Sequence, residues 1–192
     1  MTERAVAVSV EILRRHGLRH VVVGGQAIAQ DAATATRDVD VMVATDDYAG
    51  AVRALGGDPA LTLAMEGGAV TRFGIRALDG APLDLIDAGV FSGKKSGREF
   101  FDFLFAEASH EADGVRYASA EAVWYTRLMT RRWRAYAEKI VTNILDGIEV
   151  DRLARVDAIA RRFGTESAIA ERLAYVRNEL GRSDLFGGDR RE

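Results

Sequence analysis

The sequence predicts an α/β fold, in which a small mixed sheet is flanked by helices and followed by a C-terminal helical region. Residues 20–23 form a β-branched run that ends at the pair Gly24-Gly25, and residues 37–43 alternate strictly between polar and apolar side chains. Such runs and such alternation are typical of strands. After residue 90 the sequence no longer shows mainly strand patterns, and five long stretches are typical of helices.

Local signals set the expected ends of these elements. Gly17 stops the first helix, Thr45-Asp46-Asp47 is typical of a helix N-cap, and Asp79-Gly80 is typical of a hairpin turn. The expected strands span residues 20–23, 37–43, 69–78, 82–86 and 115–117. The expected helices span residues 4–16, 26–30, 47–55, 97–110, 120–132, 135–145, 150–163 and 166–180.

The chain of 192 residues is long enough for one compact domain with a small appendage. We expect a core of residues 1–115, a helical region of residues 116–182 packed on that core, and a flexible tail of residues 183–192. No sequence repeat is present.

The composition excludes several classes of protein. The absence of cysteine excludes disulfides, thiol catalysis and thiolate zinc sites. The net charge of -3 argues against a protein that coats nucleic acid, but it leaves a local basic patch open. The first residues lack an apolar signal core, and no stretch reaches the ~18 apolar residues of a membrane span. We therefore expect a cytoplasmic protein without a membrane partner.

Three aspartates form the strongest candidate site. Asp38 and Asp40 are two residues apart on an expected strand, so their carboxylates point the same way. Asp84 lies on another expected strand, and the three groups together would hold divalent cations, which prefer carboxylate oxygens. Asp87 lies on the opposite face of that strand and is typical of a cap. An isolated Asp-x-Asp is usually a solvated strand face, so the prediction depends on the combination with Gly24-Gly25.

The spacing of these motifs resembles the signature of the nucleotidyltransferase fold superfamily. Residues 21–43 contain a hydrophobic strand, Gly24-Gly25, a gap of twelve residues and the framed Asp38-Val39-Asp40. Residues 82–87 are similar to the strand that carries the third carboxylate in that superfamily. Thr36, two residues before Asp38, resembles the bacterial branch that includes the nucleotidyltransferase toxins of toxin–antitoxin systems.

The resemblance implies transfer of a nucleoside monophosphate from a nucleoside triphosphate such as ATP to an acceptor, with release of pyrophosphate. It implies Mg²⁺ or Mn²⁺ as cofactor, in a two-metal mechanism. The implied catalytic and metal-binding residues are Asp38, Asp40 and Asp84. The implied phosphate-binding residues in the core are Gly24, Gly25 and Gln26.

The helical region departs from the pattern of the toxin-like branch. In that branch a lysine lies near the nucleotide, and a basic residue followed by acidic residues comes later in the chain. Here Arg127 occupies the position of the lysine and Lys139 the later basic position. Ile140 and Asn143 occupy positions where acidic residues are expected. Arg127, Arg131 and Arg134 have a spacing that would place them on one helical face. That face would contact the triphosphate or an acceptor RNA, or it would be a solvated surface.

Two functions therefore stay open at the level of sequence. The first is a nucleotidyltransferase whose acceptor is RNA, a protein or a small molecule, and which acts as a toxin with a cognate antitoxin. The second is a catalytically impaired relative that binds nucleotides or regulates another protein. The altered residues Ile140 and Asn143 favour the second function, and the complete set of three aspartates favours the first.

Overall fold

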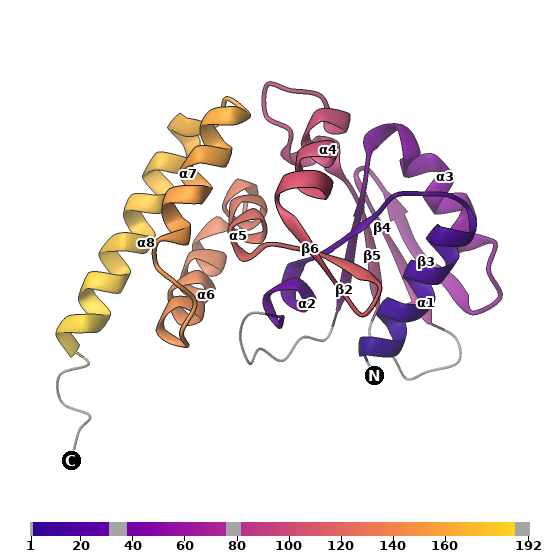
Figure 1. Ribbon diagram of the computed structural model, residues 1–192, viewed down its shortest axis with the longest axis horizontal. Coiled ribbons are helices and arrows are strands. Elements are labelled where there is room, and N and C mark those ends of the chain that lie inside the picture. The colour runs from indigo at the N-terminus through magenta and orange to yellow at the C-terminus, as the bar shows by residue number, and fades with distance from the viewer. Residues whose placement is uncertain (1, 31–37, 76–81, 187–192) are drawn as a thin grey trace, which may run out of the picture.

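The computed structural model describes residues 2–30, 38–75 and 82–186. In these parts a seven-stranded mixed sheet has the strand order β3-β4-β5-β2-β1-β7-β6. Helices cover both faces of the sheet, and a further helical layer follows it in the chain (Figure 1). The predicted α/β class, with its C-terminal helices, is confirmed.

The strands are β1 (Val21–Val23), β2 (Val39–Val43), β3 (Leu61–Gly67), β4 (Val70–Ile75), β5 (Leu83–Asp87), β6 (Ser109–Ala112) and β7 (Val115–Ala118). The helices of the first half are α1 (Thr2–Arg15), α2 (Gly24–Ile28), α3 (Thr45–Gly56) and α4 (Gly97–Glu107), with the short 3₁₀ helix η1 (Ala88–Phe91) before α4. The helices of the second half are α5 (Ala120–Met129), α6 (Trp133–Leu145), α7 (Arg152–Arg162) and α8 (Glu166–Phe186). No helix in the described ranges is both long and apolar enough to cross a membrane.

The centre of the sheet fixes the position of the aspartates. Strand β2 runs parallel to β5, and the register places Asp40 directly beside Asp84. Strand β1 pairs with the other edge of β2 in an antiparallel ladder, where Val23 lies opposite Asp40. Residues that lie side by side in neighbouring strands project from the same face of a sheet. The end of β1 and both acidic positions therefore meet within three adjacent strands.

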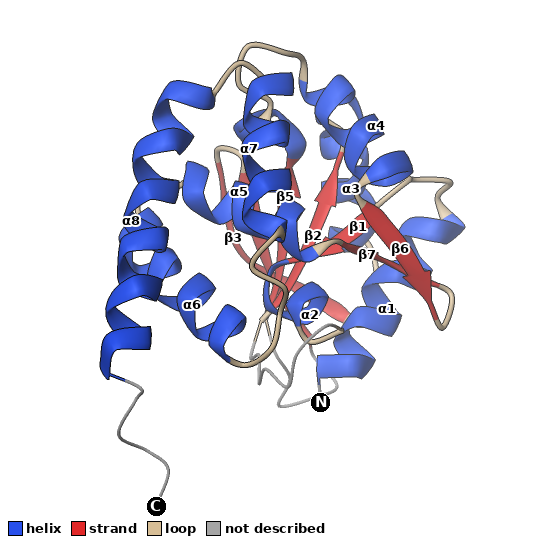
Figure 2. Ribbon diagram, turned by 60° about the vertical axis from the view of Figure 1, so that its left-hand side comes forward, coloured by secondary structure: helices blue, strands red, loops and turns tan. Residues whose placement is uncertain are grey.

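The alternation of side chains along β2 divides the buried apolar residues into two clusters. Val39, Val41 and Val43 face α1 and α3. Met42 faces the other cluster, which contains the aromatic residues of α4 and α5 together with apolar residues of α7 and α8. Asp40 is two residues from Met42 and so shares its face. The acidic positions consequently lie on the face toward which the C-terminal helices pack (Figure 2).

A buried tyrosine ties the helical half to the sheet half. The Tyr125 hydroxyl donates to the Phe91 carbonyl oxygen at 2.9 Å and lies 3.2 Å from Thr165 Oγ1. Phe100 packs against Tyr125 and against Phe163, with ring centroids 5.7 and 5.0 Å apart. These contacts join η1, α4, α5 and the turn between α7 and α8 in one core.

Two strands were not predicted from the sequence. Strand β3 is an edge strand whose residues after Leu61 are exposed, so its sequence carries little strand pattern. Residues 108–110 were expected to end a helix, but α4 stops at Glu107 and β6 pairs with β7 in a hairpin. Asp113 and Gly114 form its turn with φ angles of 50° and 72°. Asp-Gly is a strong hairpin signal that should have identified this turn.

Other differences concern element ends. Thr45 lies within α3, and its side chain makes no N-cap hydrogen bond. Thr45 instead donates to Asp87 at 2.6 Å, and Asp87 also accepts from the Gly89 N–H at 2.7 Å. Asp87 is thus the cap that the sequence predicted. The expected Asp79-Gly80 turn, Thr36 and residues 187–192 of the expected tail lie outside the described residues.

Candidate active site

The three aspartates approach one another around an arginine. Arg72, in β4, donates two hydrogen bonds to Asp84, with Nε–Oδ1 and Nη2–Oδ2 distances of 2.6 and 2.7 Å. The same Nη2 lies 3.9 Å from Asp38 Oδ2. These hydrogen bonds raise the pKa of Arg72 above its ordinary value. Arg72 therefore offsets part of the negative charge, and it directs its two short hydrogen bonds to Asp84 rather than to Asp40.

Asp40 has a perturbed acidity. Burial raises the pKa of its carboxyl to about 6, and the charges of Asp84 and Asp38 act in the same direction. Arg127 and Arg72 oppose the shift without cancelling it. Burial and the neighbouring negative charges both disfavour the charged carboxylate, which a nearby positive charge would favour. The site would therefore be stabilised by an additional cation near Asp40.

Gly24 allows the chain to approach Asp40 at the end of β1. Its φ angle is +68°, in the left-handed region that favours glycine. A Cβ atom at this position would overlap with Asp40 Oδ2. Glycine is thus required at position 24 twice, by the backbone conformation and by the nearby carboxylate.

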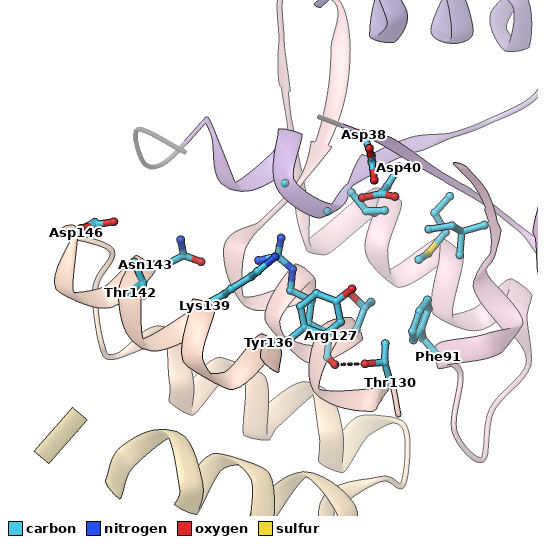
Figure 3. Close-up of a pocket in the computed structure, with 16 residues that line it drawn as sticks. Asp38, Asp40, Phe91, Arg127, Thr130, Tyr136, Lys139, Thr142, Asn143 and Asp146 are labelled. Carbon is cyan, nitrogen blue, oxygen red and sulfur yellow. Dashed lines mark hydrogen bonds between the residues drawn. The ribbon is translucent and has the colours of Figure 1, made fainter. Parts of the chain in front are cut away.

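A cleft of about 710 Å³ opens beside these groups. Its sheet-side wall consists of Val23, Gly24, Gly25, Asp38, Asp40, Met42 and Ile86. Its helical wall consists of Phe91, Thr126, Arg127, Thr130, Tyr136, Lys139, Thr142, Asn143 and Asp146. Figure 3 shows the aspartates on one side of the cleft and the side chains of α5 and α6 on the other. The cleft thus brings acidic and basic groups face to face.

Two cations gather around one aromatic ring on the helical wall. Arg127 Cζ lies 5.6 Å from the centroid of the Tyr136 ring, and Lys139 Nζ lies 5.7 Å from it. Burial lowers the pKa of Arg127, while Tyr136 and Asp40 act in the opposite direction. Both side chains extend into the cleft (Figure 3). They are placed to bind an anion that also reaches the sheet-side wall.

The structure brings only some of the predicted site residues to the cleft. Asp38, Asp40, Gly24, Gly25, Arg127 and Lys139 line it. Asp84 lies beside Asp40 but is held by Arg72 and does not line the cleft. Gln26 is buried in α2 and does not line the cleft either.

The expected common face of Arg127, Arg131 and Arg134 is wrong, because one helix does not continue through these residues. Helix α5 ends at Met129, and Thr130 is extended with a ψ angle of 164°. Arg127 lines the cleft, whereas Arg131 and Arg134 line a second hollow of about 660 Å³. That hollow also contains Arg132, Trp133 and Lys139, and its described lining includes no acidic side chain.

The carboxylates of the cleft provide part of a metal-binding site. Within the described ranges no group of three or more aspartate, glutamate or histidine side chains is arranged to hold one. Arg72 binds the carboxylate of Asp84 through two hydrogen bonds. Asp38 and Asp40 still supply hard oxygen ligands of the kind that Mg²⁺ prefers. A cation beside Asp40 would also favour the charged form of this carboxyl, whose pKa is raised by burial and by the charges of Asp84 and Asp38. The donor set thus fits a cation held by two aspartates.

Sequence reasoning missed several residues of the cleft. Tyr136, Thr142 and Asp146 line it, and none of the three was identified as a site residue from the sequence. The repeat of Tyr136, Lys139, Asn143 and Asp146 on one face of α6 was the available signal.

Comparisons with known proteins support the fold. The sequence matches no protein-family model and no curated protein sequence. The structure is similar to the crystal structure of ANT(2″)-Ia in complex with adenylyl-2″-tobramycin, with 16% identity, a TM-score of 0.50, and coverage of 93% of this chain and 99% of that chain. A nucleotidyltransferase from Thermotoga maritima, whose assignment is itself provisional, has 11% identity and a TM-score of 0.48, over 77% of this chain and 94% of that chain.

Identity this low carries information on the fold alone. The resemblance that the sequence showed in residues 21–87 and the match over the length of ANT(2″)-Ia agree on that fold. The chain therefore has the nucleotidyltransferase fold.

Proposed function

We propose that this protein transfers a nucleoside monophosphate from a nucleoside triphosphate to an acceptor hydroxyl. The acceptor oxygen forms a bond to the α-phosphorus, the bond from the α-phosphorus to the bridging oxygen breaks, pyrophosphate leaves, and the hydroxyl proton passes to solvent. The observation that carries the proposal is one cleft in which Asp38 and Asp40 face Arg127 and Lys139. The charges that face each other across this cleft are those that a metal–triphosphate requires.

Residues of both walls of the cleft would bind the substrate and its metal ion. Arg127 and Lys139 would bind phosphate oxygens from the helical side. The backbone N–H groups of Gly24 and Gly25 would bind them from the sheet side. Asp38 and Asp40 would hold Mg²⁺ or Mn²⁺, with Asp84 as a further ligand if Arg72 moves. When bound, the cation supplies the positive charge that acidifies the acceptor hydroxyl and neutralises the leaving group.

The second candidate function is a nucleotide-binding module without transfer activity. The paired hydrogen bonds from Arg72 to Asp84 favour it, because they occupy the carboxylate that would complete the metal site. Binding of triphosphates that depends on Mg²⁺, without turnover on any acceptor, would identify such a module.

The second hollow supports an acceptor that carries phosphates, such as RNA. It shares Tyr136 and Lys139 with the cleft, and its basic residues accompany the ring of Trp133. Cationic and aromatic side chains together are typical of surfaces that bind single-stranded nucleic acid. The structure of ANT(2″)-Ia contains adenylyl-2″-tobramycin, so a small molecule is the alternative acceptor to test against RNA. A toxin role with a cognate antitoxin rests on the sequence resemblance and stays a hypothesis.

The Asp40→Asn variant tests the acidic wall. We expect transfer of label from α-³²P triphosphates to fall by about 100-fold or more. We also expect the metal-free variant at pH 8 to be more stable by roughly 1–3 kcal/mol, because it removes a charge that is costly at a pKa of about 6. Label transfer and urea denaturation measure the two effects.

The control for this variant is Asp102→Asn, at an exposed aspartate that pairs with Arg19 outside the cleft. It should leave transfer unchanged. Equal transfer by wild type and Asp40→Asn would remove Asp40 from the mechanism.

The Gly24→Ala variant tests the close approach of β1 to the carboxylate. Its added Cβ would displace the Asp40 side chain, so transfer should fall by about 100-fold or more while the fold persists. Gly17→Ala is a matched control, because Gly17 has a φ angle of +67° and no atom within 4 Å of the added Cβ. Both variants should lose about 1–2 kcal/mol of stability from the backbone strain. Similar activity in the two variants would contradict the proposed contact.

The Arg131→Ala/Arg132→Ala double variant tests the basic hollow. We expect labelling of RNA to fall by about tenfold or more, with triphosphate binding unchanged, because the lost charges contact the acceptor. Arg177→Ala/Arg182→Ala removes the same charge from exposed positions of α8 and is the control. Labelling of an aminoglycoside in place of RNA, or equal losses in both double variants, would overturn the assignment of the acceptor.

A further inference from the structure

A buried polar side chain in the cleft has an unmet hydrogen-bonding group. Asn143 is 5% exposed, and its Oδ1 atom has no hydrogen-bond partner among the described residues. The side chain nevertheless lines the cleft, on the helical wall. A buried acceptor without a partner is costly, and native structures rarely contain one without a reason. The unmet carbonyl oxygen of Asn143 therefore points to a ligand that donates a hydrogen bond.

The position of Asn143 on α6 indicates which part of a nucleotide it would meet. Tyr136, Lys139, Asn143 and Asp146 recur at intervals of three and four residues and line the same cleft. Figure 3 shows Asn143 beyond Lys139, on the side away from Asp38 and Asp40. If the ammonium group of Lys139 binds phosphate oxygens, the next turn of α6, which carries Asn143, lies near the nucleoside.

We propose that Asn143 selects the nucleobase by accepting a hydrogen bond from an exocyclic amino group, that of adenine or cytosine. Guanine and uracil carry a carbonyl oxygen at the corresponding position, and two acceptors facing each other repel. The Asn143 amide also has a donor, so it would pair with an adenine edge through two hydrogen bonds, as asparagine does in nucleic-acid recognition. This inference rests on the proposed function, since it takes the cleft to bind a nucleoside triphosphate.

Equilibrium binding in the presence of Mg²⁺ tests the inference without requiring turnover. We expect the wild type to bind ATP about 10–100-fold more tightly than purine riboside triphosphate, which lacks the 6-amino group, and CTP more tightly than UTP. The Asn143→Leu variant, of similar volume, should bind each pair equally. Glu138→Gln, at an exposed position of α6 outside the cleft, should keep the wild-type preference.

The outcomes separate the two proposals. Preference for GTP or UTP, or a preference that survives in Asn143→Leu, would overturn the role of Asn143 while leaving nucleotide binding intact. Discrimination between ATP and 2′-deoxy-ATP that disappears in the variant, with no effect of the amino group, would move the contact to the ribose and also overturn it. Absence of binding by the wild type to every triphosphate would overturn the proposed function itself.

Discussion

Repulsion among like charges is the constraint on which this cleft depends. The parallel register of β2 and β5 fixes Asp40 beside Asp84, and Asp38 lies two residues away. Positive charge near such groups lowers the cost of keeping them together in their charged forms. Arg72 supplies part of that charge, while burial and the charges of Asp84 and Asp38 raise the pKa of Asp40. A cation that arrives with its substrate would supply the rest.

The helical half completes the cleft because the apolar core holds it there. Tyr125 and Phe100 connect α5 to the sheet half, and this connection places Arg127 opposite Asp40. Helix α6 then adds Lys139 and Asn143 to the same wall. Substrate binding and core packing are therefore linked, since a shift of α5 or α6 would separate the acidic wall from the basic one.

The sequence predicted the parts of the structure that local patterns encode. The alternation in residues 37–43 and the spacing from Gly24-Gly25 to Asp38 predicted the fold, and most helices lie within a few residues of their expected positions. Strand β3 was missed because an exposed edge strand needs little hydrophobic pattern. The β6–β7 hairpin was missed although Asp113-Gly114 marked it.

The details of the site depended on contacts between distant segments. Arg72 meets Asp84 only because β4 and β5 pair, and no spacing in the chain gives that contact. The end of α5 at Met129 separates Arg127 from Arg131, which a continuous helix would have kept together. Asn143 was noted in the sequence only as a departure from a family pattern. Its burial and its unmet oxygen atom became visible only in the folded chain.

A crystal structure with Mn²⁺ and a non-hydrolysable triphosphate, in which anomalous scattering locates the metal, would test whether the cleft binds a metal–triphosphate. We expect a Mn²⁺ peak at the carboxylates of Asp38 and Asp40, with the triphosphate between Gly24-Gly25 and Arg127. A metal peak elsewhere, or a nucleotide bound outside this cleft, would contradict it.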